Sequence, residues 1–277
     1  EPFWEVRVHQ LKTTPSLSGL CVGYERGEWR AKQFAKHAME WLPEFALKKS
    51  ECQAMDSGNA IQLIRRAAKS VYDSSKFENR GEFGELFLHI AIRQIFHSLP
   101  AISKIYYKTA NNETVKGFDA VHVVGSPDDL ELWLGEAKFY TDFDHAVRDV
   151  VAELLKHTNT DYLRNEFSLI MNKIDEALPH AQILKKLLSP NTSLDEIFKR
   201  VCIPVLLTYD SACVANHAIC NEAYIAAFTS EINANYQRFA SKSLPQNVKI
   251  HLFLLPLHTK RKLIEKLDEQ LKIWQRL

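Results

Sequence analysis

Residues 117–140 read GFDAVHVVGSPDDLELWLGEAKFY, two strand-like stretches separated by a turn sequence. Valine dominates the first stretch, 118–124, while leucine and aromatic residues dominate the second, 130–140, and SPDD at 126–129 is typical of a turn. Two antiparallel strands joined at this turn bring Asp119 near Glu136, because the two residues lie about equally far from it. The stretch therefore predicts a paired strand unit with two carboxylates close together.

The second of these strands carries two charges where a buried strand should carry none. Side chains alternate along a strand, so Glu136 and Lys138 project from the same face as Leu132 and Leu134. An isolated buried charge is costly to desolvate, so each of the two needs a partner or a metal ion. A structural ion pair of Lys138 with Asp119 or Glu136 at the rim of the sheet meets this need, and short motifs also match by chance.

Residues 128–149 contain seven acidic residues against Lys138 and Arg148. A phosphate would be repelled from such a region unless divalent cations occupied it.

The surrounding pattern predicts an α/β fold with a mixed central sheet flanked by helices. Residues 82–97 form a helix that is apolar nearly all round and that Pro100 ends, and 102–109 form a strand that precedes the pair. We expect the later elements to be helices over 142–155, 163–178, 224–239 and 263–274, and strands over 201–209 and 249–255. The strand at 201–209 is a continuous apolar run, typical of a strand buried on both faces.

The polar stretch at 73–76 is the best candidate for a boundary. Before it, we expect strands at 4–8 and 20–24 and helices at 29–47 and 60–72. The predicted division is an N-terminal mixed region, 1–75, packed on a core, 76–277, that carries a C-terminal helical extension.

Composition excludes several classes of protein. The 277 residues carry a net charge of +1, so any nucleic-acid contact must come from a local patch or a partner. The five cysteines are scattered and odd in number, which argues against a secreted disulfide framework. The chain has no apolar run of about 18 residues and no signal-peptide pattern, so we expect a cytoplasmic protein. It also lacks a phosphate-binding loop and a G-x-S-x-G motif, so neither ATP nor serine-hydrolase chemistry is expected.

In the order helix, three strands, helix, strand, the chain carries Glu85, Asp119 and the run Glu136-Ala137-Lys138. This arrangement resembles the PD-(D/E)xK nuclease superfamily, the restriction-endonuclease-like fold. The usual proline before the aspartate is absent, since Gly117-Phe118 stands there. The segments GEFGELFLHIAIRQIF, GFDAVHVV and LELWLGEAKFY, in this order, resemble the HamA nuclease-subunit family of the bacterial Hachiman antiphage defence system.

The resemblance implies a metal-dependent deoxyribonuclease. Asp119, Glu136 and the backbone carbonyl of Ala137 would hold Mg²⁺ or Mn²⁺, and Glu85 would complete the metal shell directly or through water. Lys138 would orient the attacking water and stabilise charge in the transition state. Tyr140 and Lys108 are weaker candidates for holding substrate phosphate. The implied partners are DNA and the helicase subunit HamB, which would restrain the nuclease until infection or DNA damage is sensed.

Other interpretations stay open. A catalytically inactive scaffold or DNA-end-binding subunit would use the same fold without hydrolysis, and an RNase or a nickase would use the same charges. Cys213, His217 and Cys220 have spacing that invites a zinc site, but no fourth ligand is nearby and packed reduced cysteines explain them better. Residues 258–277 contain six Lys or Arg against three acids, which is more often a solvated helix face than a nucleic-acid contact.

Overall fold

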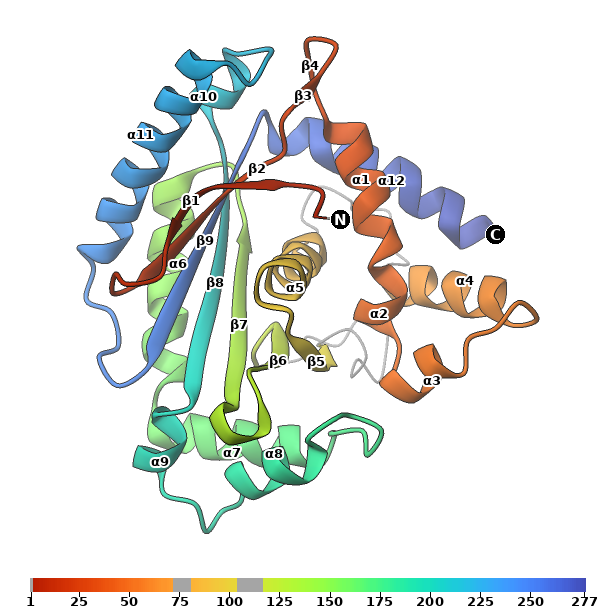
Figure 1. The fold of residues 1–277 in the computed structure, drawn as a ribbon, viewed down its shortest axis with the longest axis vertical. Helices are drawn as coiled ribbons and strands as arrows, with labels where there is room; N and C mark the ends of the chain where they lie inside the picture. Colours follow the sequence, from red (N-terminus) through yellow and green to blue (C-terminus); the bar gives the residue numbers. More distant parts are fainter. Residues whose placement is uncertain (1, 72–80, 104–116) are drawn as a thin grey trace.

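A computed structural model describes residues 2–71, 81–103 and 117–277. Its centre is a seven-stranded mixed sheet in the order β1-β2-β9-β8-β7-β6-β5 (Figure 1). The strands are β1 (Glu5–Gln10), β2 (Ser16–Cys21), β5 (Leu99–Ser103), β6 (Ala120–Val124), β7 (Glu131–Phe139), β8 (Val201–Asp210) and β9 (Lys249–Leu257). The short strands β3 (Tyr24–Glu25) and β4 (Glu28–Trp29) form a separate pair. This is the predicted mixed α/β architecture with a central sheet flanked by helices.

Strand directions divide the sheet into two parts. β5, β6 and β7 pair antiparallel, whereas β7, β8, β9 and β2 run parallel to one another, and β1 closes the edge antiparallel to β2. The pair β6–β7 has the predicted register, with Ala120 opposite Gly135. The carboxyl ends of β7, β8 and β9 consequently lie at the same end of the sheet.

Helices cover both faces of the sheet (Figure 1). One face packs against α5 (Glu82–Phe96), with α1 (Ala31–Glu40), α2 (Leu42–Ala46), α4 (Ala60–Val71) and α12 (Lys260–Arg276) around it. The other face packs against α6 (Phe143–His157), α7 (Thr160–Met171) and α11 (Glu222–Ala240). The remaining helices are α3 (Lys49–Gln53), α8 (Ala181–Leu187), α9 (Leu194–Phe198), α10 (Ala212–Ala215) and the 3₁₀ turn Pro127–Asp129.

Alternation along β8 explains why two helical layers are needed. Val205 and Leu207 join the core beneath α6 and α11, while Leu206 joins the core beneath α5 and α12. All three side chains are fully buried, as predicted for a strand covered on both faces. The helix α5 is likewise buried along most of its length, as its apolar sequence predicts.

Several predicted elements differ from the observed ones. The helix expected over 29–47 is two helices, α1 and α2, and the strand expected over 20–24 is β2, which ends at Cys21. The helix expected over 163–178 ends at Met171, and Ile174 and Leu178 reach the core from a turn instead. Asp175 caps that turn by accepting a hydrogen bond from the Ala177 amide (2.9 Å), and Pro179 has no amide hydrogen to continue a helix. Pro100 does not follow the α5 helix as a simple stop but lies in β5, paired with His122.

The N-terminal segment contributes β1 and β2 to the central sheet, where β2 pairs with β9. The boundary expected at residues 75 and 76 falls in 72–80, outside the described residues. The end of the strand expected over 102–109 is likewise outside them, as is Lys108. In the described part of the chain, no helix is both long enough and apolar enough to cross a membrane.

Candidate active site

A cavity of about 620 Å³ lies at the carboxyl end of β7. Its wall contains all four side chains that the sequence predicted for catalysis, Glu85, Asp119, Glu136 and Lys138, together with Ala137. α5 supplies Glu85, the residue before β6 is Asp119, and β7 supplies the other three. In parallel sheets, ligand sites commonly lie at the carboxyl ends of strands, which is the edge this cavity occupies.

The pairing of β6 with β7 positions Asp119 beside the Glu136-Ala137-Lys138 run. The Asp119 amide donates to the Gly135 carbonyl (2.8 Å), and the Ala137 amide donates to Asp119 Oδ2 (2.9 Å). Both bonds join Asp119, the residue before β6, to β7, which carries the Glu136-Ala137-Lys138 motif. The pairing of the two strands therefore fixes the Asp119 carboxylate beside Ala137.

Glu136 is almost completely buried, with 1% of its surface exposed. Burial raises its pKa well above the ordinary value, and the negative charges of Asp119 and Glu153 raise it further. His157 Nδ1 pairs with Glu136 Oε1 and holds the carboxyl group in place. The negative charge of Asp119 therefore acts on Glu136 in a low-dielectric setting and disfavours its ionised form.

Lys138 forms an ion pair with Glu153 of α6. Burial alone would lower the pKa of Lys138, but the hydrogen bond and charge of Glu153 outweigh it and raise the pKa. The ammonium group is therefore charged and held at the cavity wall. A charged lysine cannot ligate a cation, but it can donate hydrogen bonds to water or to a phosphate oxygen.

Close packing of α5 on β7 brings Glu85 to the same cavity. A Cβ atom on Gly84 would lie 3.0 Å from the Phe139 Cβ and 3.5 Å from the Phe139 amide nitrogen. The glycine therefore lets the first turn of α5 approach the motif strand. Glu85, the next residue, is half-buried in the cavity wall.

The cavity offers hard oxygen donors that fit a small divalent cation. Within residues 2–71, 81–103 and 117–277, no three His, Cys, Asp or Glu side chains gather at metal-binding spacing. The oxygen donors are the carboxylates of Asp119 and Glu136. Ala137 and Glu85 also line the cavity. Mg²⁺ commonly uses one or two carboxylates and keeps several waters, and a cation would relieve the repulsion that raises the pKa of Glu136.

Sequence reasoning missed two side chains that hold the motif, Glu153 and His157. His157 is buried, and its partner is the motif residue Glu136. Both residues line the cavity from α6 and are four positions apart, hence on one helix face. That spacing, on the helix after the motif, is the signal that could have found them.

Other predicted residues have different positions. Tyr140 lines the cavity and donates from its hydroxyl to Asp149 Oδ2 (3.0 Å). In the candidate zinc segment, the His217 Nδ1–H donates to the Cys213 carbonyl (2.7 Å).

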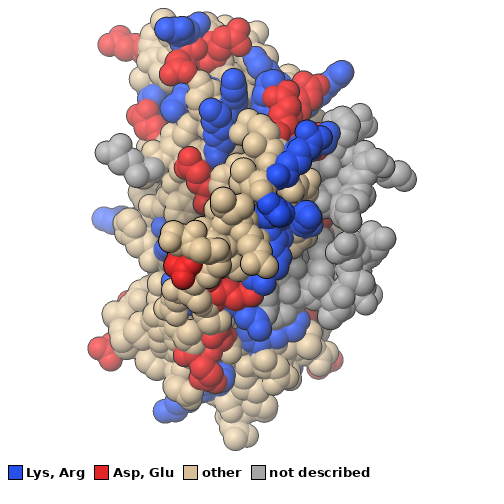
Figure 2. Space-filling model, turned by 90° about the vertical axis from the view of Figure 1, so that its right-hand side faces the viewer, with Lys and Arg blue, Asp and Glu red and all other residues tan. Residues whose placement is uncertain are grey.

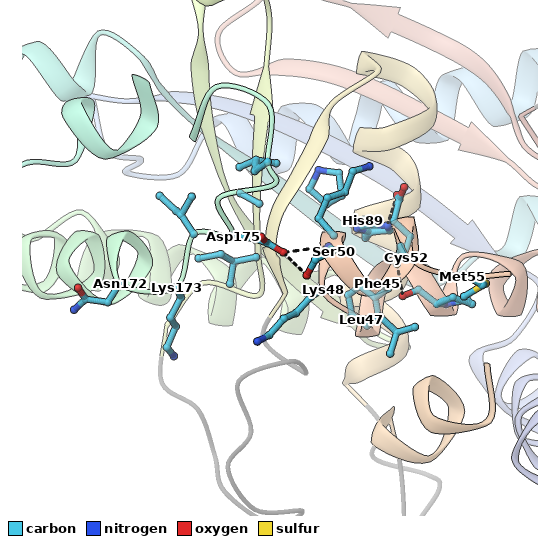
Figure 3. A pocket seen from close by; sticks show the side chains of 18 of the residues that line it. Phe45, Leu47, Lys48, Ser50, Cys52, Met55, His89, Asn172, Lys173 and Asp175 are labelled. Atoms are coloured by element: carbon cyan, nitrogen blue, oxygen red, sulfur yellow. Dashed lines mark hydrogen bonds and ion pairs between the residues drawn. The ribbon is translucent and has the colours of Figure 1, made fainter. Parts of the chain in front are cut away.

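A second cavity, of about 630 Å³, lies between α2, α3, β5 and the turn after α7 (Figure 3). Phe45 and Leu47 form part of its apolar lining, and Ser50 spans its rim by donating from its amide and hydroxyl to Asp175 Oδ2 (3.1 and 2.9 Å). Its inner wall contains Glu44, whose carboxylate is held by Arg93 and His89. This cavity contains none of the predicted catalytic residues.

The chain was compared with known protein families and with curated proteins. The sequence model of the HamA family matches residues 2–271. No curated protein matches the chain.

Proposed function

The chain belongs to the HamA family, and from this membership and the cavity we propose that it is a metal-dependent deoxyribonuclease. The observation that carries the proposal is the convergence of Asp119, Glu136 and Lys138 on one cavity wall. A carboxylate pair with an adjacent lysine suits hydrolysis of a phosphodiester, whose negative charge repels an incoming hydroxide.

In the proposed site, Asp119, Glu136 and the Ala137 carbonyl would hold Mg²⁺ or Mn²⁺, with Glu85 completing the shell directly or through water. When bound, such an ion supplies Lewis acidity, which activates water for attack and offsets charge on the phosphate. The Lys138 ammonium donates hydrogen bonds that orient the attacking water and stabilise charge on the phosphate oxygens.

Two residues of α6 fix the positions of the Glu136 and Lys138 side chains. His157 holds the Glu136 carboxyl group, and Glu153 holds the Lys138 ammonium group, so both motif side chains have fixed directions before substrate arrives. Fixed charges need little reorganisation during the reaction, which is the main source of electrostatic catalysis. We expect substitutions at either α6 residue to slow cleavage without removing the metal ligands.

Family membership supports a role in the Hachiman antiphage system. The chain would act there as the nuclease subunit, restrained by the helicase subunit HamB until infection or DNA damage is sensed. A near-neutral chain without a phosphate-binding loop needs such a partner for loading on DNA. Release of the nuclease would then degrade DNA broadly.

The test is cleavage of supercoiled and linear DNA with Mg²⁺ or Mn²⁺, by the chain alone and with the helicase partner and ATP. Glu136→Ala and Lys138→Ala should each lower the cleavage rate by about 100-fold or more, the scale for losing one preorganised charge. Glu131→Gln is the matched control, because Glu131 lies at the far end of the same strand and pairs with Lys249.

Wild-type rates in the Glu136 and Lys138 variants, with folding verified, would refute the assigned site. Absence of cleavage by the wild-type chain under every condition would favour the alternative, an inactive scaffold or DNA-end-binding subunit. Cleavage of RNA in preference to DNA would keep the site and change the substrate.

A further inference from the structure

The C-terminal helix supplies a lysine to the candidate active site, far in sequence from the motif. Lys260 is the first residue of α12 and lines the same cavity as Asp119, Glu136 and Lys138. It reaches this position because β9 runs parallel to β7 and β8, so the segment after β9 emerges at the edge where β7 ends. Phe139, Thr208 and Leu255 lie in register across the three strands.

Hydrogen bonds tie the backbone of Lys260 to the cavity edge. The Lys260 amide donates to Asp210 Oδ1 (2.6 Å), and the Asp210 amide donates to the carbonyl of Thr141, another residue of the cavity wall. Thr259 caps α12 by accepting from the Lys262 amide (3.2 Å). The start of α12 is therefore fixed relative to the motif strand rather than attached through a loose loop.

The Lys260 ammonium group lies over an aromatic ring. Its Nζ atom lies 4.8 Å from the centroid of the Phe139 ring, whereas the carboxylate of Asp210 accepts its hydrogen bond from the Lys260 backbone amide. Burial lowers the pKa of this half-buried amine, and the charge of Asp210 offsets only part of the effect. An ammonium in this state is incompletely solvated, so an anion entering the cavity would stabilise it.

The other basic residues of α12 are mostly neutralised by neighbouring acids. Arg261 pairs with Glu265, Lys262 with Glu28, Lys266 with Glu269, and Lys272 with Asp268. Figure 2 shows the face of the molecule that includes α4 and α12, where Lys and Arg side chains are interspersed with Asp and Glu. Lys260 differs from these residues because it lines the cavity.

We infer, given the proposed nuclease function on which this depends, that Lys260 binds a backbone phosphate of the DNA strand held in the cavity. The carboxylates of the site repel the substrate, and the Lys138 ammonium is already paired with Glu153. Lys260 and Lys156 of α6 add two further positive charges to the cavity lining, and the Lys156 Nζ lies 5.7 Å from the centroid of the Tyr162 ring. Phosphate contacts of this kind position a strand without reading its sequence.

The test compares Lys260→Met, which keeps an apolar stem against Phe139 but removes the charge, with Lys260→Arg, which keeps the charge. Arg261→Gln is the matched control, because it removes one positive charge from the next residue of the helix, whose side chain is 90% exposed. Binding of a fluorescent oligonucleotide is followed by anisotropy in Ca²⁺ at several salt concentrations, and kcat and KM for cleavage are measured in Mg²⁺.

For Lys260→Met we expect Kd and KM to rise about fivefold to tenfold. The slope of log Kd against log salt should fall by about 1, the value for the loss of one phosphate contact. Lys260→Arg and Arg261→Gln should stay near wild type. A wild-type Kd and salt slope in folded Lys260→Met would overturn the inference, even if Glu136→Ala is inactive and the nuclease function stands. A wild-type chain that neither binds nor cleaves DNA, alone or with the helicase partner and ATP, would overturn the proposed function and this inference together.

Discussion

A buried histidine of the central sheet should make the protein less stable in mild acid. His251 of β9 is 2% exposed and lies between two serines of β2, with Nδ1 2.7 Å from Ser16 Oγ and Nε2 2.9 Å from Ser18 Oγ. Burial first, and the nearby charge of His9 second, lower the pKa of His251 to about 3. The folded protein therefore holds this imidazole neutral well below the pH at which it would charge in the unfolded chain.

The sign and size of the effect follow from proton linkage. Between pH 6.5 and pH 3 the unfolded chain binds a proton at this position and the folded chain does not, so the free energy of unfolding falls as pH falls. The contribution is fully present above pH 6.5. With an unfolded pKa of about 6.5, the loss from this one group reaches about 2 kcal/mol at pH 5.

Urea unfolding at pH 7, 6 and 5 measures this loss in the wild-type chain, His251→Gln and the control His145→Gln. Each variant is compared with itself across pH, so the hydrogen bonds lost in His251→Gln at neutral pH cancel. The wild type should lose about 2 kcal/mol more than His251→Gln between pH 7 and pH 5. His145, whose side chain is 52% exposed, should behave as wild type when replaced. Equal losses in the wild type and His251→Gln would refute the reasoning.

Two further predictions concern the candidate site. Mg²⁺ at ten times its Kd should raise the free energy of unfolding by about 1.4 kcal/mol, because in the proposed site it would bind only the folded chain, and Glu136→Gln should abolish this gain. Thermal unfolding in EDTA and in Mg²⁺ checks this, and an equal gain in the variant would place the ion elsewhere. Gly84→Val should destabilise the protein by about 1–3 kcal/mol, because its side chain would meet Phe139 at 3.0 Å and push α5 from β7. Urea unfolding at neutral pH measures this, and a valine variant as stable as wild type would contradict the close packing of α5.

Much of the candidate site was predictable because its central residues are close in sequence. The turn at 126–129 and the alternation of side chains were enough to predict that Asp119 lies beside the strand of Glu136, and the register of β6 with β7 confirms it. The apolar sequence of 82–97 likewise predicted a buried helix. The catalytic roles of Glu85, Asp119, Glu136 and Lys138 stay predictions, which the cleavage assay tests.

Helix ends and distant partners were harder to predict. The continued apolar periodicity at Ile174 and Leu178 favoured a longer helix, but these residues reach the core from a turn stabilised by Asp175, whose side chain also binds Ser50 from α3. A contact between residues 125 positions apart has no local signature. The partner of His157 was missed for a related reason, because Glu136 lies on another element.

The sequence by itself determined the strand pair, the face shared by Glu136 and Lys138, and the order of elements, since all three depend on local periodicity and turn chemistry. Only the tertiary structure decided which charges surround the motif. The parallel run of β7, β8 and β9 brings Lys260 to the edge where the motif ends, and packing of α6 places Glu153 and His157 against it. The raised pKa of Glu136 arises at this level as well, because burial and the neighbouring carboxylates exist only after the chain has folded.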